Sequence, residues 1–387
     1  MTAQEKKARI EELKNQIAIK KAEVDEFNAM QMALKLMINS EYGAMANKHF
    51  VMYNPVVANA ITAMGREIIQ HMADENEKYW YEHWHLDYEL HAVLGVQGVK
   101  KLIKGKDHVS IYCDTDSLFV SFDPGMKSCN WQGDQEKFVF LVNDNRLAKF
   151  FQNSLDKYAS RYGVKNIQDF ELERIAESII FLEKKRYVQN VVYEDGVKHN
   201  RLSYIYPKGV ELVKSSTPPF VREKLLELMK YLLDTQNNVN IAELNKKIRD
   251  IKNQFKLTDV EEIASTSSLS DYNKWINDDQ SRFDYKSGTP FHVKAAAFHN
   301  YLLNQNPTLK SKYNMLKAGN KIKYYYCKHS TNDVFAFSRG MFPKEFAPQV
   351  DIDAQFERTV LNIVNMFTDA LGLPLLNTRL TFSHSIF

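Results

Sequence analysis

The sequence has few of the features that characterise secreted and membrane proteins. It contains only three cysteines, Cys113, Cys129 and Cys327, and an odd number at wide spacing argues against a disulfide framework and for a reducing compartment. Its longest apolar runs are too short to cross a bilayer, and its charged N-terminus does not resemble a signal peptide. We therefore expect a protein that is not secreted and has no membrane partner.

The sequence also lacks a strong charge of either sign, since its net charge is only +3. Balanced charge does not exclude nucleic acid as a partner, because acidic surface elsewhere can offset a basic groove. The hydrophobic fraction of 44% is typical of a globular chain with material for two or three packed units.

Hydrophobic periodicity predicts an α+β fold, in which strand-rich sequence gives way to helix-rich sequence near Ser215. No Gly or Pro separates the first two helical patterns, so the sequence leaves open whether the chain turns between them. Helices are expected over residues 3–26, 28–48, 56–88, 136–160, 215–265 and 351–371, and strands over 108–122, 177–206 and 320–338.

Two carboxylates lie two residues apart in the segment 112–117, Tyr-Cys-Asp-Thr-Asp-Ser. β-forming residues on both sides predict a strand, a tight turn and a second strand. In an extended chain Asp114 and Asp116 would point the same way, because side chains alternate along a strand. Two carboxylates at a rigid hairpin tip suit a divalent cation, which prefers oxygen ligands. An ordinary Asp-rich turn is the alternative.

Four residues of the second predicted helix, Lys35, Asn39, Tyr42 and Gly43, share one face because they occupy positions i, i+4, i+7 and i+8. That face offers a cation, an amide, an aromatic ring and a bare backbone. A nucleotide presents its triphosphate, sugar and base in a comparable order, and Lys35 suits the phosphates. A core helix with one lysine that reaches solvent is the alternative.

Two basic segments follow. The run 184–187, Lys-Lys-Arg-Tyr, sets three cations beside an aromatic ring, which suits a nucleic-acid backbone. Residues 208–218, Lys-Gly-Val-Glu-Leu-Val-Lys-Ser-Ser-Thr-Pro, bring hydroxyl and backbone N–H groups to the start of a predicted helix, a natural phosphate site. A solvated charge run and a simple helix cap are the alternatives. The candidate nucleic-acid contacts are Lys184, Lys185, Arg186, Tyr187, Lys208, Lys214, Ser215 and Thr217.

These four segments occur in the order and context of family-B DNA polymerases, which the sequence resembles from about residue 28 to 350. The KxxxNSxYG helix resembles the fingers motif, YxDTDS resembles the palm metal motif, and the two basic segments resemble those that grip the primer duplex. Residues 288–294, Gly-Thr-Pro-Phe-His-Val-Lys, resemble a thumb segment of the tailed-phage branch. The resemblance implies partial helical fingers over 1–48, a palm with an antiparallel sheet backed by helices over 49–214, and a mainly helical thumb with a C-terminal tail over 215–387.

The resemblance implies two-metal nucleotidyl transfer to a primer 3′ end, with Mg²⁺ as the metal and Mn²⁺ as an alternative. Asp116 would bridge both metals, Asp114 would lie beside them, and Glu173 resembles a palm glutamate near the metals.

The resemblance also assigns the substrate contacts. Lys35 would contact the triphosphate of the incoming dNTP and act as an acid at the leaving pyrophosphate. Asn39, Tyr42 and Gly43 would contact the dNTP and the nascent base pair. The two basic segments, together with His292 and Lys294, would contact the primer-template DNA.

The family's first metal motif, an Asp followed by Ser-Leu-Tyr-Pro, and its proofreading exonuclease have no counterpart here. A two-metal site without one principal carboxylate should be nearly inactive, because close metal ions need shared negative ligands. We therefore expect a second polypeptide to supply the exonuclease, the first half of the palm and the first fingers helix, as in a split phage gene. A shortened form of a longer chain fits equally well. Residues 10–24, with their apolar stripe, would pack against the partner's helix, and the expected location is the cytoplasm of an infected host cell.

Two alternatives remain for the activity. The chain could be a non-catalytic DNA-binding or assembly subunit, although Asp114, Asp116, Lys35 and Tyr42 together argue against a decayed site. An autonomous polymerase would need a substitute carboxylate, for which Glu173 is the candidate. The tail 380–387 ends on two hydrophobic residues and would either dock in a sliding-clamp groove or pack on the thumb.

Overall fold

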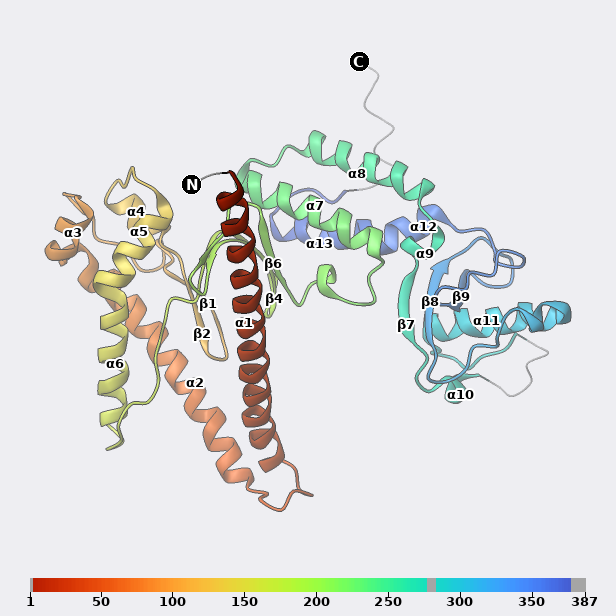
Figure 1. Cartoon of the computed structure of the whole chain (residues 1–387), viewed down its shortest axis with the longest axis horizontal. Helices are drawn as coiled ribbons and strands as arrows, with labels where there is room; N and C mark the ends of the chain where they lie inside the picture. Colours follow the sequence, from red (N-terminus) through yellow and green to blue (C-terminus); the bar gives the residue numbers. More distant parts are fainter. Residues whose placement is uncertain (1–2, 277–282, 377–387) are drawn as a thin grey trace. The chain divides into compact units, whose positions relative to one another are not determined.

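The computed structural model describes residues 3–276 and 283–376, which form α-helices and three small antiparallel sheets (Figure 1). The fold is α+β, as the sequence predicts. The chain divides into two compact units, Met1–Glu171 and Leu172–Phe387, each described below by itself and called the N-terminal and C-terminal unit. Among the described residues, no helix combines the length and apolar character that crossing a membrane requires.

The core of the N-terminal unit is aromatic and lies where several helices meet a two-stranded hairpin. Trp80, Trp84 and Phe138 are fully buried there, and the Trp84 indole donates a hydrogen bond to the Ser128 hydroxyl at 2.8 Å. The elements after the first helix are α2 (Pro55–Lys78), a π-helical turn (Tyr79–His83), a 3-10 turn (Trp84–Leu86), α3 (Tyr88–Leu94), β1 (Ser110–Asp114), β2 (Ser117–Val120), α4 (Asp123–Ser128), α5 (Gln135–Val142), a second π-helical turn (Asn143–Leu147) and α6 (Ala148–Ser160).

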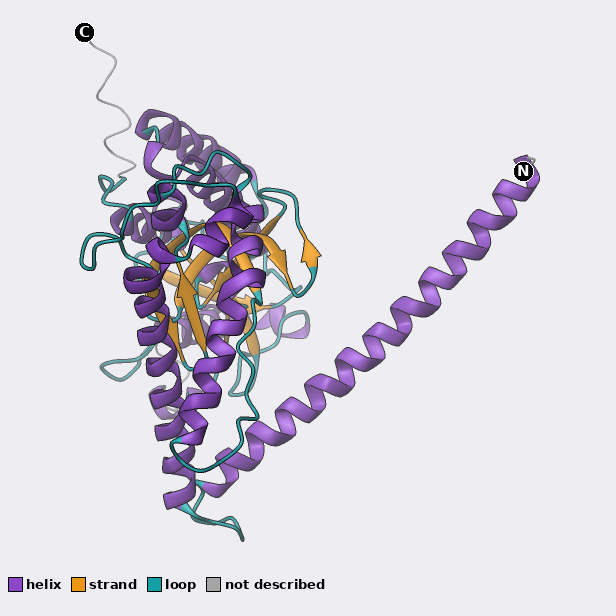
Figure 2. Ribbon diagram, turned by 90° about the vertical axis from the view of Figure 1, so that its left-hand side faces the viewer, coloured by secondary structure: helices purple, strands orange, loops and turns teal. Residues whose placement is uncertain are grey.

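The first helix, α1 (Ala3–Met45), runs for 43 residues without interruption, so the chain does not turn between the two helical patterns of the sequence. It meets α2 only through the turn at its C-terminal end and otherwise projects away from the rest of its unit (Figure 2). Nearly all of its described side chains are exposed, including apolar ones such as Ile17 and Leu34. The described side chains of α1 thus form a long exposed surface with apolar residues in it.

The C-terminal unit contains two antiparallel sheets with separate cores. In the first sheet β4 is central, with β3 on one edge and with β5 and β6 along the other. Asp195 and Gly196, both at positive φ, form a turn after β4. The first sheet comprises β3 (Arg174–Glu183), β4 (Arg186–Glu194), β5 (Val197–Lys198) and β6 (Tyr204–Lys208), and the second β7 (Ser265–Ser268), β8 (Lys321–Tyr326) and β9 (Val334–Ser338).

Helices cover both sheets of this unit. Ile180, Val188 and Ile205 of the first sheet join one buried cluster with α7, α8 and the last helices, while α11 packs on β8 and β9. The helical elements are a 3-10 turn (Glu211–Val213), α7 (Pro219–Thr235), a 3-10 turn (Gln236–Asn238), α8 (Ile241–Leu257), α9 (Val260–Ile263), α10 (Tyr272–Trp275), α11 (Phe291–Gln305), a 3-10 turn (Pro307–Ser311), α12 (Ile352–Phe356), a π-helical turn (Glu357–Leu361) and α13 (Asn362–Ala370).

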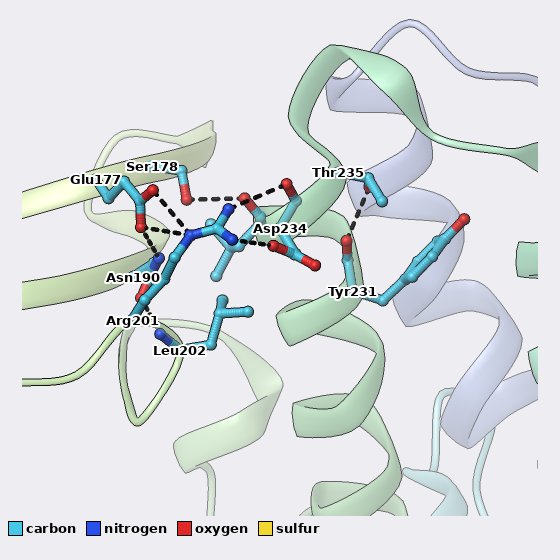
Figure 3. Close-up of polar contacts among 9 residues, drawn as sticks. Glu177, Ser178, Asn190, Arg201, Leu202, Tyr231, Asp234 and Thr235 are labelled. Carbon is cyan, nitrogen blue, oxygen red and sulfur yellow. Dashed lines mark hydrogen bonds and ion pairs between the residues drawn. The ribbon is translucent and has the colours of Figure 1, made fainter.

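A polar network joins the first sheet to α7 (Figure 3). The Arg201 guanidinium pairs with Glu177 of β3 and with Asp234 of α7, both at 2.8 Å. The fully buried Asn190 of β4 donates to Glu177 and accepts from the backbone N–H of Leu202. This network fixes the loop that leads into β6 and thereby the basic segment that follows it.

Candidate functional site

The two carboxylates of the Asp-Thr-Asp segment lie at the tip of the hairpin formed by β1 and β2. Asp114 pairs with Ser117 across the strands, which leaves Thr115 and Asp116 as the turn. The turn is held by local hydrogen bonds, from the Asp116 N–H to the Asp114 carbonyl at 2.7 Å and from the Ser117 hydroxyl to the same carbonyl at 3.1 Å. The predicted strand, turn and strand are confirmed.

The two carboxylates have different surroundings. Asp114 is buried, and its Oδ1 accepts a hydrogen bond from the Thr115 hydroxyl at 3.1 Å, whereas Asp116 is exposed. Thr115 has a φ of +59°, so the chain is not extended here and the alternation expected for a strand does not apply. The exposed Asp116 is accessible to a cation or substrate, while Asp114 is part of the turn itself.

The base of the hairpin is anchored on α2 and the turn that follows it. The fully buried Asn76 donates to the Ser110 hydroxyl at 2.9 Å, and the Tyr81 hydroxyl donates to the Asp107 carbonyl at 2.7 Å. Burial and the charges of Asp74 and Glu77 raise the pKa of the Cys113 thiol. Sequence reasoning missed Asn76 as an anchor, because an Asn within a helical pattern carries no sign of burial.

The described residues supply only part of a metal-binding set. Within residues 3–276 and 283–376, no group of three His, Cys, Asp or Glu side chains gathers closely enough to hold a metal ion. Glu173 belongs to the other unit, where it is exposed near Arg174 at the start of β3. Asp116 fits as one oxygen ligand of a divalent cation.

The predicted nucleotide-binding residues lie near the C-terminal end of α1. Lys35, Asn39, Tyr42 and Gly43 occupy one face of this helix, as expected, and all four are exposed. No heavy atom lies within 4 Å of where a Cβ on Gly43 would be, so this stretch of backbone is open to a ligand. Lys6, Lys7 and Arg9 of the same helix are also exposed.

The two basic segments of the C-terminal unit are neighbours in space. Lys184 and Lys185 form the exposed tip of the hairpin between β3 and β4, and Tyr187 pairs with Lys208 of β6. The Lys208 ammonium lies 5.8 Å from the centre of the Tyr187 ring, which is almost completely buried. The structure therefore brings together two segments that lie about twenty residues apart in the sequence.

The other predicted DNA contacts are divided between two places. Lys214 donates to Glu211 at 2.8 Å, Ser215 is exposed and Thr217 is buried just before α7. His292 and Lys294 lie in the first turn of α11, on the second sheet. Burial lowers the pKa of His292, and Lys294 stands 4.8 Å from the Tyr285 ring centre. The tail 380–387 lies outside the described residues, so its proposed clamp contact stays a prediction.

Comparison with known proteins shows the family to which the sequence belongs. The sequence model of DNA polymerase family B matches residues 4–369, a range that includes the fingers-like, Asp-Thr-Asp and two basic segments. The chain belongs to DNA polymerase family B. It is 25% identical to the DNA-directed DNA polymerase of Enterobacteria phage T4 over 284 residues, which cover 69% of this chain and 28% of the relative.

The family-B chain has archaeal as well as phage relatives. It is 25% identical over 277 residues to DNA polymerase 1 of Aeropyrum pernix, covering 70% of this chain and 21% of the relative. It is 27% identical over 224 residues to the DNA-directed DNA polymerase of Escherichia phage RB69, covering 52% of this chain and 22% of the relative. The chain thus spans about a fifth to just over a quarter of these relatives' length.

Proposed function

We propose that this chain is the fingers, palm and thumb part of a DNA-directed DNA polymerase that adds dNTPs to a primer 3′ end. The observation that carries the proposal is the exposed Asp116 at a rigid hairpin tip, within a chain that belongs to DNA polymerase family B. In this proposal α1 is the fingers segment, residues 49–214 are the palm, and residues 215–387 are the thumb.

The side chains would divide the reaction between them. Asp116 would hold divalent metal ions, and Asp114 would keep the turn that presents Asp116 in place. Metal ions, when bound, neutralise phosphate charge and promote ionisation of the attacking hydroxyl. Lys35 would contact the triphosphate and donate a proton to the leaving pyrophosphate, while Tyr42 and Gly43 of the same face would lie beside the nascent base pair.

The rest of the active site would come from additional polypeptide. Two described carboxylates do not complete a two-metal site, and the chain spans only a fraction of its relatives' length. The α1 helix provides a surface for such a partner, because an exposed apolar stripe repeats at intervals of three, four or seven residues, as in a coiled coil. The stripe consists of Ile10, Leu13, Ile17, Val24, Phe27, Leu34 and Ile38. We propose that it packs on a helix of a partner that also supplies the exonuclease and the first metal-binding aspartate.

Primer extension tests this proposal directly. The chain would be assayed with magnesium, all four dNTPs and primer-template, alone and with the product of the neighbouring reading frame. Synthesis only with the partner is expected, and Asp116→Ala should abolish it while Asp169→Ala, an exposed carboxylate outside the four segments, should not. Synthesis by the chain alone would contradict the need for a partner. DNA binding without synthesis in either mixture would favour a non-catalytic assembly subunit.

A further inference from the structure

The tip of the hairpin between β3 and β4 has an unusual backbone conformation. Glu183 pairs with Arg186, so Lys184 and Lys185 alone form the turn, and Lys185 has a φ of +63°. This left-handed conformation is uncommon for a residue with a side chain, and it persists only where surrounding structure holds it. The neighbours of the tip therefore matter for where its two lysines lie.

Gly209, which follows β6, lies directly against this tip. A Cβ at Gly209 would lie 2.2 Å from the Lys185 carbonyl oxygen, and Gly209 itself has a φ of +65°. Only glycine lets the two backbones come this close. The second basic segment thus forms a backbone support for the turn of the first.

The Arg186 guanidinium is directed into the protein. One terminal nitrogen donates to Glu183 at 2.5 Å, and the other donates to both carboxylate oxygens of Glu211 at 3.1 Å and lies 4.0 Å from the sulfur of Met366 in α13. Only 20% of the Arg186 side chain and 18% of the Glu211 side chain are exposed. Lys214 also donates to Glu211, so this carboxylate is neutralised within the protein.

We infer that Arg186 is a positioning residue, which with Glu211 and Gly209 holds the Lys184–Lys185 tip against the phosphate backbone of primer-template DNA. Arg186 itself does not contact the DNA. This assignment rests on the proposed function and corrects the simplest interpretation of the Lys-Lys-Arg-Tyr run, in which all three cations bind phosphate. A guanidinium that left Glu211 for a phosphate would leave a half-buried carboxylate with one partner fewer, which opposes that exchange.

The salt dependence of DNA binding separates positioning from direct contact. Each phosphate contact contributes about −0.9 to the slope of log K against log salt. Binding of the full chain to fluorescent primer-template would be titrated at several salt concentrations for the wild type and for single variants. Lys184→Gln should lower the magnitude of the slope by about 0.9. Arg186→Gln should weaken binding roughly tenfold, equivalent to about 1.4 kcal/mol, at an unchanged slope, because both lysines still reach phosphate but from a less ordered turn.

Two further variants make the test independent of any single substitution. Arg186→Lys keeps the charge but loses the two-pronged geometry, so a positioning role predicts the same loss as Arg186→Gln, and a phosphate contact predicts near-normal binding. If Glu211 holds Arg186 in a positioning role, Glu211→Gln should weaken DNA binding. If the substitution instead frees Arg186 to contact DNA, binding should become tighter. The double variant Arg186→Gln/Glu211→Gln should bind no more weakly than Arg186→Gln.

Failure of this inference is distinguishable from failure of the proposed function. A slope reduced by Arg186→Gln, or tighter binding by Glu211→Gln, in a wild-type chain that binds DNA would overturn the inference alone. A wild-type chain that does not bind primer-template at any salt concentration, either alone or with its partner polypeptide, would overturn the inference together with the proposed function. Thermal unfolding of each variant would confirm that the comparison concerns folded protein.

Discussion

At the scale of single residues, burial distinguishes two carboxylates that look alike in the sequence. Asp114 is buried and bonded within its turn, and Asp116 is exposed on the same turn. The sequence locates this pair, but it does not distinguish the two residues, because the distinction depends on the left-handed conformation of Thr115. A residue that only supports the turn should respond differently to substitution from a residue that binds a metal ion.

Replacement of each carboxylate by its amide tests this division. Asp116→Asn should reduce primer extension by the complete polymerase to background, because a cation ligand is lost. Asp114→Asn should reduce it about 10- to 100-fold, as is typical of residues that orient a ligand without binding the metal. The measurement is the steady-state rate with saturating DNA at several magnesium concentrations. Equal loss in both variants would show that Asp114 also binds metal.

Asn190 should be important for stability. Its amide joins Glu177 of β3 to the backbone N–H of Leu202, which has a φ of +59°, and it is fully buried. Asn190→Ala removes the hydrogen-bond partner of the Leu202 N–H and leaves Glu177 with Arg201, so it should lower the free energy of unfolding by about 1–3 kcal/mol, as measured by urea denaturation. Asn237→Ala, at an exposed position after α7, is the matched control and should change it by less than about 0.5 kcal/mol. A similar effect of both substitutions would contradict a structural role for Asn190.

Sequence motifs identify residue types more readily than they identify partners. The Lys-Lys-Arg-Tyr run indicates a basic site, but Arg186 meets Glu211, which lies 25 residues later in the chain. Nothing in the spacing of these residues shows that Glu211 reaches back to Arg186. The inward direction of Arg186 therefore emerges only from the structure.

At the scale of elements, α1 shows what periodicity can and cannot predict. Periodicity predicts the helices over residues 3–48, and the structure confirms them as one element. The apolar stripe also follows from the sequence, because a heptad pattern depends only on spacing. What covers the stripe does not follow from the spacing of its residues.

Two isoleucines of α1 provide a matched test of the partner surface. Ile17 belongs to the apolar stripe and Ile19 lies outside it, yet both are more than half exposed. Ile17→Lys should weaken association with the partner polypeptide by at least tenfold, or about 1.4 kcal/mol, and Ile19→Lys should not. Neither should change the unfolding of this chain alone by more than about 0.5 kcal/mol, because both side chains already face solvent. Equal effects on association, measured by calorimetry, would exclude the stripe as the contact.

At the scale of the whole molecule, contacts divide the chain between Glu171 and Leu172, whereas the composition of the sequence changes near Ser215. The physical reason lies in the core. Sheet residues such as Val188 and Ile205 share one buried cluster with α7 and α8, so this strand-rich segment packs with the helices that follow it. Composition reports a change of secondary structure and cannot report which elements share a core. The assignment of fingers, palm and thumb stays a prediction.

The two units should differ in acid stability, because the C-terminal unit buries His299. Burial lowers the pKa of His299 to about 4, although its ring nitrogens lie 2.9 Å and 3.3 Å from the carbonyl oxygens of Ala336 and Asn314. The unfolded chain, with a histidine pKa of about 6.5, binds a proton that the folded unit does not bind in this range. The contribution of neutral His299 to the free energy of unfolding is fully present above about pH 6.5 and decreases as the pH falls toward 4.

This linkage predicts that His299 alone lowers the free energy of unfolding of the C-terminal unit by about 2 kcal/mol between pH 6.5 and pH 5. Urea unfolding as a function of pH, followed for the two units by hydrogen exchange, would measure it. His299→Gln should remove this part of the pH dependence, while His329→Gln, at an exposed position of the same unit, should preserve it. Identical pH profiles for His299→Gln and the wild type would contradict the assignment.

The three cysteines of the chain differ in a way that has a practical use. Cys129 and Cys327 are buried, and burial raises the pKa of the Cys327 thiol to about 12, so neither should react readily with thiol reagents. Cys113 also has a raised thiol pKa, but it is exposed to reagents and immediately precedes Asp114 in β1. A fluorophore on the native chain should therefore attach at this one position, without any engineered substitution. Its emission would report, in real time, when metal ions, nucleotide or DNA reach the hairpin tip.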